Sequence, residues 1–292
     1  MNAVMQFCQT TLNPFILIFT VSNLAAMGLQ VKVPDVLRGL QNKKSLALIV
    51  LWGWVVGPAF GYLITKVLPL AEPYAIVVLL CSLAPCAPFL QQMVGKARGD
   101  MGFAGAFIPL VAVGTVVFMP LLAPVLIKGL AISAWALAKP LLLTILLPLM
   151  IGAALRHYTT TVATKIFPAV KGIALLFTLA TMVDCLVVFG RGMLNTAGDL
   201  ALLAMTLFMV AMGVISYQFG FGMPQAQRSV MALGMGTRNI AAVFAAALAI
   251  PNADPRIVVM VVMWTLWSIA LAALGARIFA KQAGATPMPG AT

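Results

Sequence analysis

The sequence predicts an all-α integral membrane protein. Of its 292 residues, 63% are hydrophobic and only 8% are charged, whereas a soluble domain is about 25% charged. The apolar runs are about 20 residues long, which suits a helix that crosses a bilayer. They also lack the alternation of polar and apolar residues that is typical of membrane β-strands. Helices are therefore expected to form every membrane span.

Nine apolar runs have the length and composition of membrane spans. The ninth has the clearest start, because Asp254 can cap a helix whose first residue is Pro255. The tail at residues 282–292, mostly Gly, Ala, Pro and Thr, is expected to be disordered. The spans are expected at residues 13–30, 45–67, 73–95, 101–128, 131–155, 164–190, 197–218, 228–250 and 255–279.

The basic residues predict the orientation of these spans. Lys and Arg number 18 against six Asp and Glu, and in a soluble protein this excess would suggest nucleic-acid binding. Here we interpret them as orientation signals between the spans and near the span ends, and no nucleic-acid partner is expected. With nine spans, 12 basic residues fall on one side and five on the other, while Arg238 lies within the membrane. The chain is therefore expected in the plasma (inner) membrane, with its N-terminus outside and its C-terminus in the cytoplasm.

The third and eighth spans carry helix breakers at matching positions. Pro85 and Pro88 lie inside the third, and Gly234 and Gly236 precede Arg238 in the eighth. A guanidinium at mid-bilayer costs about 3 kcal/mol, so we expect it to line a polar cavity at a break. The third and eighth spans cross the bilayer in opposite senses. Two interrupted helices at matching positions of inverted halves are typical of the substrate site of a secondary transporter.

Several short motifs, in this order and spacing, resemble the bile acid:sodium symporter family, which also includes transporters of pantoate, pyruvate and other organic anions. The resemblance covers about residues 14–281. The motifs are Gly28-Leu29 before a basic loop, Pro58 in the next span, Lys96-Ala97-Arg98-Gly99-Asp100 after the first break, Leu147-Pro148-Leu149-Met150-Ile151-Gly152, and Gly234-Met235 before the second break.

This resemblance implies two inverted repeats and a division into two domains. A panel domain would hold the first, fifth and sixth spans, at residues 13–30 and 131–190. A core domain would hold the others, at residues 45–128 and 197–281. The two broken helices would cross in the core and face the crevice where substrate binds, and transport would proceed by alternating access.

The residues that hold sodium in the family are largely replaced here. Ala232 stands where sodium-coupled members have a glutamate, Gly53 stands where they have a glutamine, and residues 86–91 differ from their first-break motif. Sodium requires several hard oxygen ligands, as other hard cations do. We therefore expect weakened or absent sodium coupling, no metal site and no cofactor, and proton coupling remains open.

Candidate substrate and crossover residues gather at the two breaks. Arg238 either binds an anionic substrate through its bidentate fork or holds the crossover together in place of sodium. A purely structural arginine bonded to backbone carbonyls is the third alternative. Gln91 and Gln92 are candidates because an amide in hydrocarbon needs a partner. The full set is Pro85, Cys86, Pro88, Gln91, Gln92, Gly234, Gly236, Thr237, Arg238 and Asn239.

Asp184 is the only acidic residue deep within a span, and intramembrane acids are often functional. Three roles are open for it: pairing with Arg238, titrating as a proton-coupling group, or reaching the outer interface near Arg191.

The sequence thus predicts a secondary active transporter of a small or amphipathic organic anion. The alternatives are a passive channel or facilitator, and an arsenite-type exporter in which Cys81 and Cys86 supply soft ligands. An enzyme is not expected, because the single His and scattered acids form no catalytic cluster. The lipid bilayer is the expected partner besides the substrate. Substrate identity, direction, driving ion and oligomeric state are left open.

Overall fold

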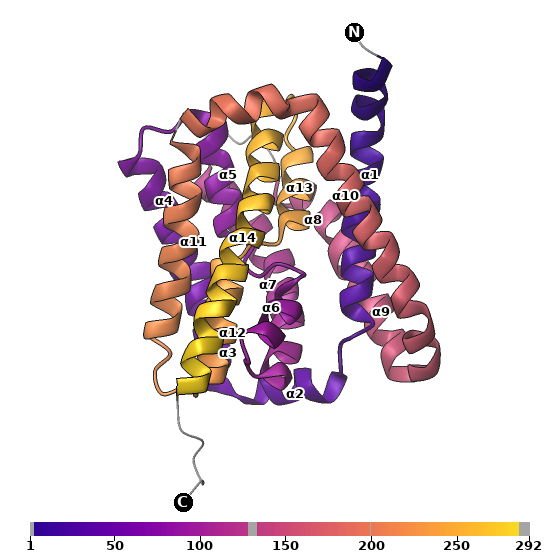
Figure 1. Cartoon of the computed structure of the whole chain (residues 1–292), viewed down its shortest axis with the longest axis vertical. Coiled ribbons are helices and arrows are strands. Elements are labelled where there is room, and N and C mark those ends of the chain that lie inside the picture. The colour runs from indigo at the N-terminus through magenta and orange to yellow at the C-terminus, as the bar shows by residue number, and fades with distance from the viewer. Residues whose placement is uncertain (1–2, 128–132, 199, 286–292) are drawn as a thin grey trace, which may run out of the picture.

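The computed structural model describes residues 3–127, 133–198 and 200–285, and all regular secondary structure in these ranges is helical. Most helices run roughly parallel in one bundle, with α2 lying across the end opposite the N-terminus (Figure 1). Seven segments are long and apolar enough to cross a membrane. They are Val4–Gly28, Lys43–Val67, Met101–Leu126, Ala134–Tyr158, Thr160–Gly190, Ala201–Gln218 and Pro255–Gly284.

Two further predicted spans are each split into a pair of short helices, at the positions where breaks were predicted. These pairs are α5 with α6, and α12 with α13. In chain order the helices are α1 (Ala3–Gly28), α2 (Val33–Gln41), α3 (Lys43–Val50), η1 (Leu51–Val56), α4 (Gly57–Val67), α5 (Glu72–Ser82), α6 (Leu90–Lys96), α7 (Met101–Leu126), α8 (Ala134–Leu141), η2 (Leu142–Leu146), α9 (Leu147–Tyr158), α10 (Thr160–Gly198), α11 (Ala201–Gln218), α12 (Gln225–Gly236), α13 (Ile240–Leu248) and α14 (Pro255–Ala285).

The structure differs from the predicted boundaries in several places, and α1 begins at Ala3, ten residues before the predicted start of the first span. The basic connection after the first span contains a helix, α2, which starts with proline near its N-terminus, has Asp35 in its first turn and buries none of its residues. The sixth span is one long helix, α10, which rises beside α1 and bends toward α11 (Figure 1). The tail is predicted to begin at residue 282, but α14 continues to Ala285. Residues 286–292, and residues 128–132 with the predicted connection at 129–130, lie outside the described residues.

Two π-helical segments, η1 and η2, interrupt membrane helices immediately before a proline. Pro58 and Pro148 have no backbone N–H and displace the carbonyl four residues earlier, which belongs to Trp54 in η1 and to Thr144 in η2. A wider helical turn absorbs this displacement, and such π-segments are frequent near functional sites. The segment η1 reaches the first break, because the Trp54 indole donates to the Leu83 carbonyl at 3.1 Å.

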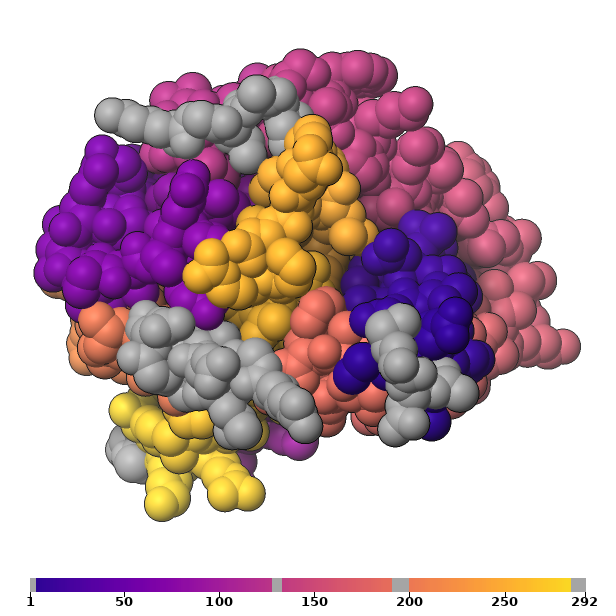
Figure 2. All heavy atoms as spheres, turned by 90° about the horizontal axis from the view of Figure 1, so that it is seen from above, coloured from indigo at the N-terminus to yellow at the C-terminus, as the bar shows by residue number. Residues whose placement is uncertain are grey.

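Two groups of helices pack closely, and they also contact each other through α10 and α14. In the first, α1 packs against α9 and α10, and its backbone approaches α9 so closely that a Cβ at Gly28 would lie 2.3 Å from the Leu149 carbonyl oxygen. In the second, α11 packs against α12 and α14 contacts α5, α6 and α12. The helix α8 contacts α7 and α13 of the second group. Figure 2 views the end that carries the N-terminus, where the connection between α13 and α14 lies at the centre.

Candidate functional site at the crossing of two broken helices

The first break separates α5 from α6. Pro85 and Pro88 cannot donate the backbone hydrogen bonds that would continue a helix, and proline disfavours a helical conformation in the residue before it. The chain therefore extends after α5, and Cys86 adopts a positive φ of 73°. The Cys86 backbone N–H donates to the carbonyls of Gly234 and Thr237, each at 2.9 Å.

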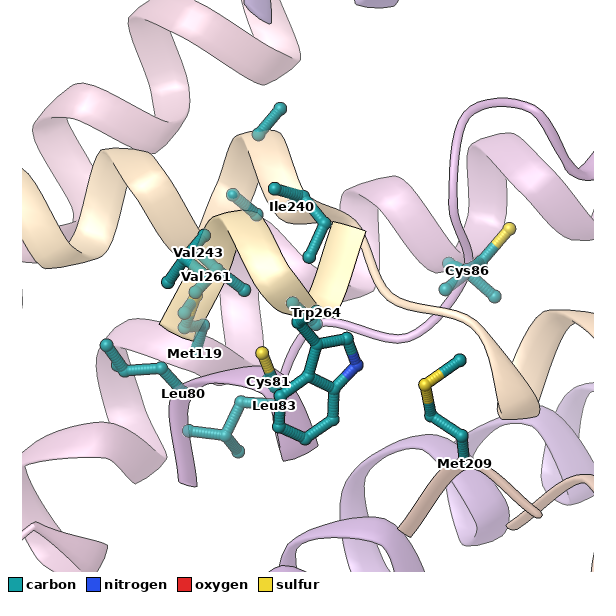
Figure 3. Packing of buried hydrophobic residues seen from close by; sticks show 14 of the residues in the cluster. Leu80, Cys81, Leu83, Cys86, Met119, Met209, Ile240, Val243, Val261 and Trp264 are labelled. Atoms are coloured by element: carbon teal, nitrogen blue, oxygen red, sulfur yellow. The ribbon is translucent and has the colours of Figure 1, made fainter. Parts of the chain in front are cut away.

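The second break, between α12 and α13, supplies the partners of the first. Pro85 and Arg238 form an isolated antiparallel β-bridge, and the Asn239 N–H donates to the Ala84 carbonyl at 2.8 Å. The Ala87 N–H donates to the Thr237 hydroxyl at 3.1 Å. The two connections pass each other beside Cys86 (Figure 3). Each break therefore supplies hydrogen-bond partners for backbone groups that the other break leaves without a helical partner. Such partners are needed because hydrocarbon offers none.

Gly234 serves close packing at the crossing. A Cβ there would lie 2.3 Å from the Phe107 ring, so a larger residue would push α7 away from α12. Gly234 lies inside α12 and its φ is not positive. The sequence predicted this glycine as a helix breaker, whereas the helix continues through it and ends at Gly236.

Arg238 points into the protein interior. Its side chain is fully buried, and its guanidinium lies over the Phe208 ring of α11, 4.6 Å from the ring centroid. Nη2 donates to the carbonyl of Met235 in the last turn of α12. Nε and Nη1 have no hydrogen-bond partner within the described residues, and neither of the ion pairs found there involves Arg238. The charge is thus held by a ring face and a carbonyl.

A cavity of about 590 Å³ lies beside the crossing. On one side its walls come from α1 and α10, and on the other from α6, both breaks and α14. Arg238 borders the cavity, but with a side chain that is fully buried. Among the described residues that line it, the charged ones are Lys171 and Arg238, both basic. Polar residues in the lining include Asn23, Gln30, Gln91, Gln92, Lys171 and Thr178.

The predicted site residues divide between the cavity and the crossing. Pro88, Gln91, Gln92 and Arg238 border the cavity. The other six, Pro85, Cys86, Gly234, Gly236, Thr237 and Asn239, are not in its lining, and the backbone or hydroxyl groups of most of them form the crossing itself.

Lys171 was not singled out from the sequence. It is one of the 12 basic residues counted on one side of the membrane, although it falls inside the predicted span at 164–190. In the structure it lies within α10, and its exposed side chain borders the cavity. One signal could have identified it. Lys171, Ala174, Leu175 and Thr178 are spaced as one face of a helix, and all four line the cavity.

Asp184 lies away from the cavity, buried between α10 and α1. The Thr11 hydroxyl donates to its carboxylate at 2.8 Å. It makes no ion pair with Arg238, and the side chain of Arg191 lies outside the described part of the chain. Cys81 and Cys86 are both buried. No group of three or more His, Cys, Asp or Glu residues suited to a metal ion occurs within the described ranges.

The fold and cavity define a class: a multi-pass helical membrane protein built around two broken helices, which is the architecture of secondary transporters. Comparison with known families makes this specific. The model of the sodium bile acid symporter family matches residues 15–197, more than half of the chain, and the chain belongs to this family. Members are transporters, not enzymes. The second break and Arg238 lie beyond the matched residues.

The curated relatives are distant. The probable sodium/metabolite cotransporter BASS3 of Oryza sativa subsp. japonica, a chloroplast protein, is 23% identical over 193 residues, which is 66% of this chain and 46% of the relative. The probable sodium/metabolite cotransporter BASS1 of Arabidopsis thaliana, also chloroplastic, is 24% identical over 216 residues, which is 73% of this chain and 54% of the relative. The chain spans about half the length of these relatives.

Proposed function

We propose that this chain is a secondary active transporter that moves a small or amphipathic organic anion by alternating access, with weakened or absent sodium coupling. The carrying observation is the charge of the cavity: its two charged lining residues are basic, and no acidic residue lines it. Apolar residues such as Phe19, Met27 and Leu175 alternate with amide and hydroxyl groups along the walls. Such a lining suits a substrate with one anionic end and an apolar body.

The proposed topology has nine crossings, in which each broken pair crosses once, with the N-terminus outside and the C-terminus in the cytoplasm of a plasma membrane. The broken helices belong to the core domain, and α1 and α10 to the panel domain. The cavity reaches Gln30 after α1 and Met101 at the start of α7. Both lie at the end of the molecule where α2 and its basic residues lie, which supports a cavity open to the cytoplasm.

We assign the substrate's anionic group to Lys171. Its side chain is exposed and its ammonium lies 5.8 Å from the Phe167 ring centroid, whereas the Arg238 side chain is fully buried. An exposed ammonium can reach a carboxylate without breaking an existing ion pair. Gln91 and Gln92, on the opposite wall, would then contact the polar groups of the substrate.

The proposal of weak sodium coupling rests on how the crossing uses its oxygens. The Thr237 hydroxyl donates to the Leu233 carbonyl and accepts from Ala87. The Asn239 side-chain oxygen caps α13 by accepting from the Ala242 N–H. The carbonyls of Ala84 and Thr237 also accept hydrogen bonds across the crossing. These oxygens are therefore already engaged by protein donors, which leaves them less available to a cation that needs several oxygen ligands.

Arg238 fits the role of a fixed cation that holds the crossing. A bound cation would be coordinated by a carbonyl at the end of a broken helix. Here the Arg238 guanidinium contacts such a carbonyl, because Nη2 donates a hydrogen bond to that of Met235. Its contact with Phe208 then ties the crossing to α11. In this proposal Arg238 stabilises the crossing of the two breaks, and Lys171 binds the substrate.

Substrate binding tests the proposal through a matched pair of variants. Purified protein is screened for thermal stabilisation by a panel of organic anions. Lys171→Gln should weaken binding of a stabilising anion about tenfold or more, because a charge-assisted contact contributes about 1.5–3 kcal/mol. Lys165→Gln, six residues earlier in α10 and outside the cavity lining, is the control. Equal affinity of both variants would remove Lys171 from the site.

Two further measurements address mechanism. Counterflow in proteoliposomes should show accelerated exchange of labelled anion when the vesicles are preloaded, which a channel does not give. Replacing sodium by potassium should leave binding and uptake unchanged, and a strict sodium requirement would contradict the proposed loss of coupling.

A further inference from the structure

The core next to the crossing contains several buried hydrogen-bond donors without acceptors. Nε and Nη1 of Arg238, Nε1 of Trp264 and the hydroxyl of Ser268 have no hydrogen-bond partner within the described residues. All three side chains are fully buried. Trp264 and Ser268 are four residues apart in α14, so they share one face of that helix. Because buried polar groups are nearly always hydrogen-bonded, these unpaired donors indicate a bound acceptor.

Phe208 of α11 brings Arg238 and Trp264 to one place. The guanidinium lies over its ring at 4.6 Å, and the Trp264 ring meets it edge-on with 5.9 Å between centroids. Figure 3 shows the indole nitrogen of Trp264 directed toward the space between Cys86 and Met209. Cys86 adjoins Pro85, which forms the β-bridge with Arg238. The indole nitrogen is therefore directed toward the first break, which the β-bridge joins to Arg238.

Within the described residues, no acidic side chain forms an ion pair with the positive charge of the Arg238 guanidinium. A buried ion without a counter-ion is costly, because it has lost its hydration and gained no opposite charge. Here the guanidinium contacts the Phe208 ring, and the Met235 carbonyl accepts a hydrogen bond from Nη2 alone. The remaining groups are N–H donors on a cation and on a neutral indole. Such a set recognises an anion.

We propose that Arg238 and Trp264 form a binding site for a small monatomic anion, a halide such as chloride. The full burial of both side chains excludes an organic anion of the size that the neighbouring cavity would hold. Apolar neighbours favour a weakly hydrated ion. The bound halide neutralises the guanidinium and links α14 to the crossing. This site is separate from substrate binding at Lys171 and does not rest on the proposed transport function.

Halide-dependent stability tests the site without a transport assay. Purified protein is unfolded thermally in sodium chloride, sodium bromide and sodium gluconate at the same sodium concentration. Chloride and bromide should raise Tm saturably by about 2–4 °C over gluconate, because a ligand bound only to the folded state stabilises it. Trp264→Phe keeps a ring against Phe208 but removes the N–H, and should lose most of this rise. Trp135→Phe, at a residue that is 67% exposed, should keep it.

A crystal grown in sodium bromide gives a direct answer even if Trp264→Phe folds poorly. An anomalous bromide peak between the Arg238 guanidinium and the Trp264 indole would confirm the site. Equal Tm values in chloride and gluconate, with no bromide peak there, would overturn the proposal. Either outcome leaves the Lys171 experiments unaffected.

Discussion

Replacing Thr237 by valine should test whether the two breaks hold each other. Thr237 is only 2% exposed. Its hydroxyl accepts from the Ala87 N–H at 3.1 Å and donates to the Leu233 carbonyl at 2.7 Å. Valine keeps the branched shape but leaves the buried Ala87 N–H without a partner, which costs about 1–3 kcal/mol, and loses a second bond of about 1 kcal/mol. The expected loss of stability is about 2–4 kcal/mol.

Thermal unfolding of the purified protein measures this loss. At roughly 2 °C per kcal/mol for a chain of this size, Tm should fall by about 4–8 °C. Thr115→Val is the matched control, because Thr115 is also fully buried but its hydroxyl donates only to Val111 of its own helix, α7. That variant should lose about 1 kcal/mol or less. Equal Tm values for the two variants would show that the crossing does not depend on the Thr237 hydroxyl.

Three other substitutions test packing and charge. Gly114→Ala should destabilise the protein by about 1–3 kcal/mol, because the new Cβ would lie 2.2 Å from the Trp54 ring. Gly172→Ala, with no neighbouring atom within 4 Å, should stabilise α10 by up to about 1 kcal/mol. A higher Tm for Gly114→Ala than for Gly172→Ala would contradict this packing. The hydrogen bond from Arg256 lowers the pKa of Asp254, so its ionised form stabilises the fold above the ordinary pKa of about 3.8 and this contribution is lost as pH falls further. Asp254→Asn should therefore lower Tm slightly at pH 7, by less than about 1 kcal/mol for a partly exposed pair, and the difference from wild type should vanish near the acid limit of the assay. A difference that is independent of pH would show that capping, and not charge, is responsible.

The breaks could be predicted from the sequence because their causes are local. Pro85 and Pro88 end a helix by their own chemistry, and Arg238 in an apolar run demands an interruption. The partner of Arg238 could not be predicted, because Phe208 is 30 residues away and looks like any lipid-facing aromatic. Lys171 was missed for a similar reason: in a strongly apolar helix the polar stripe is narrow, and charge counting assigns a basic residue to the nearest connection. The helix α2 was missed because its few apolar residues gave no run of spanning length.

The mutual pairing of the breaks has a consequence for biosynthesis. Ala87 leaves the ribosome 150 residues before its partner Thr237. Until then, the N–H groups of Cys86 and Ala87 and the carbonyl of Ala84 lack the acceptors and donors that they have in the finished protein. Lipid offers no substitute for these partners. We therefore expect the third predicted span to stay in a hydrated or translocon-shielded environment until the eighth predicted span has been synthesised.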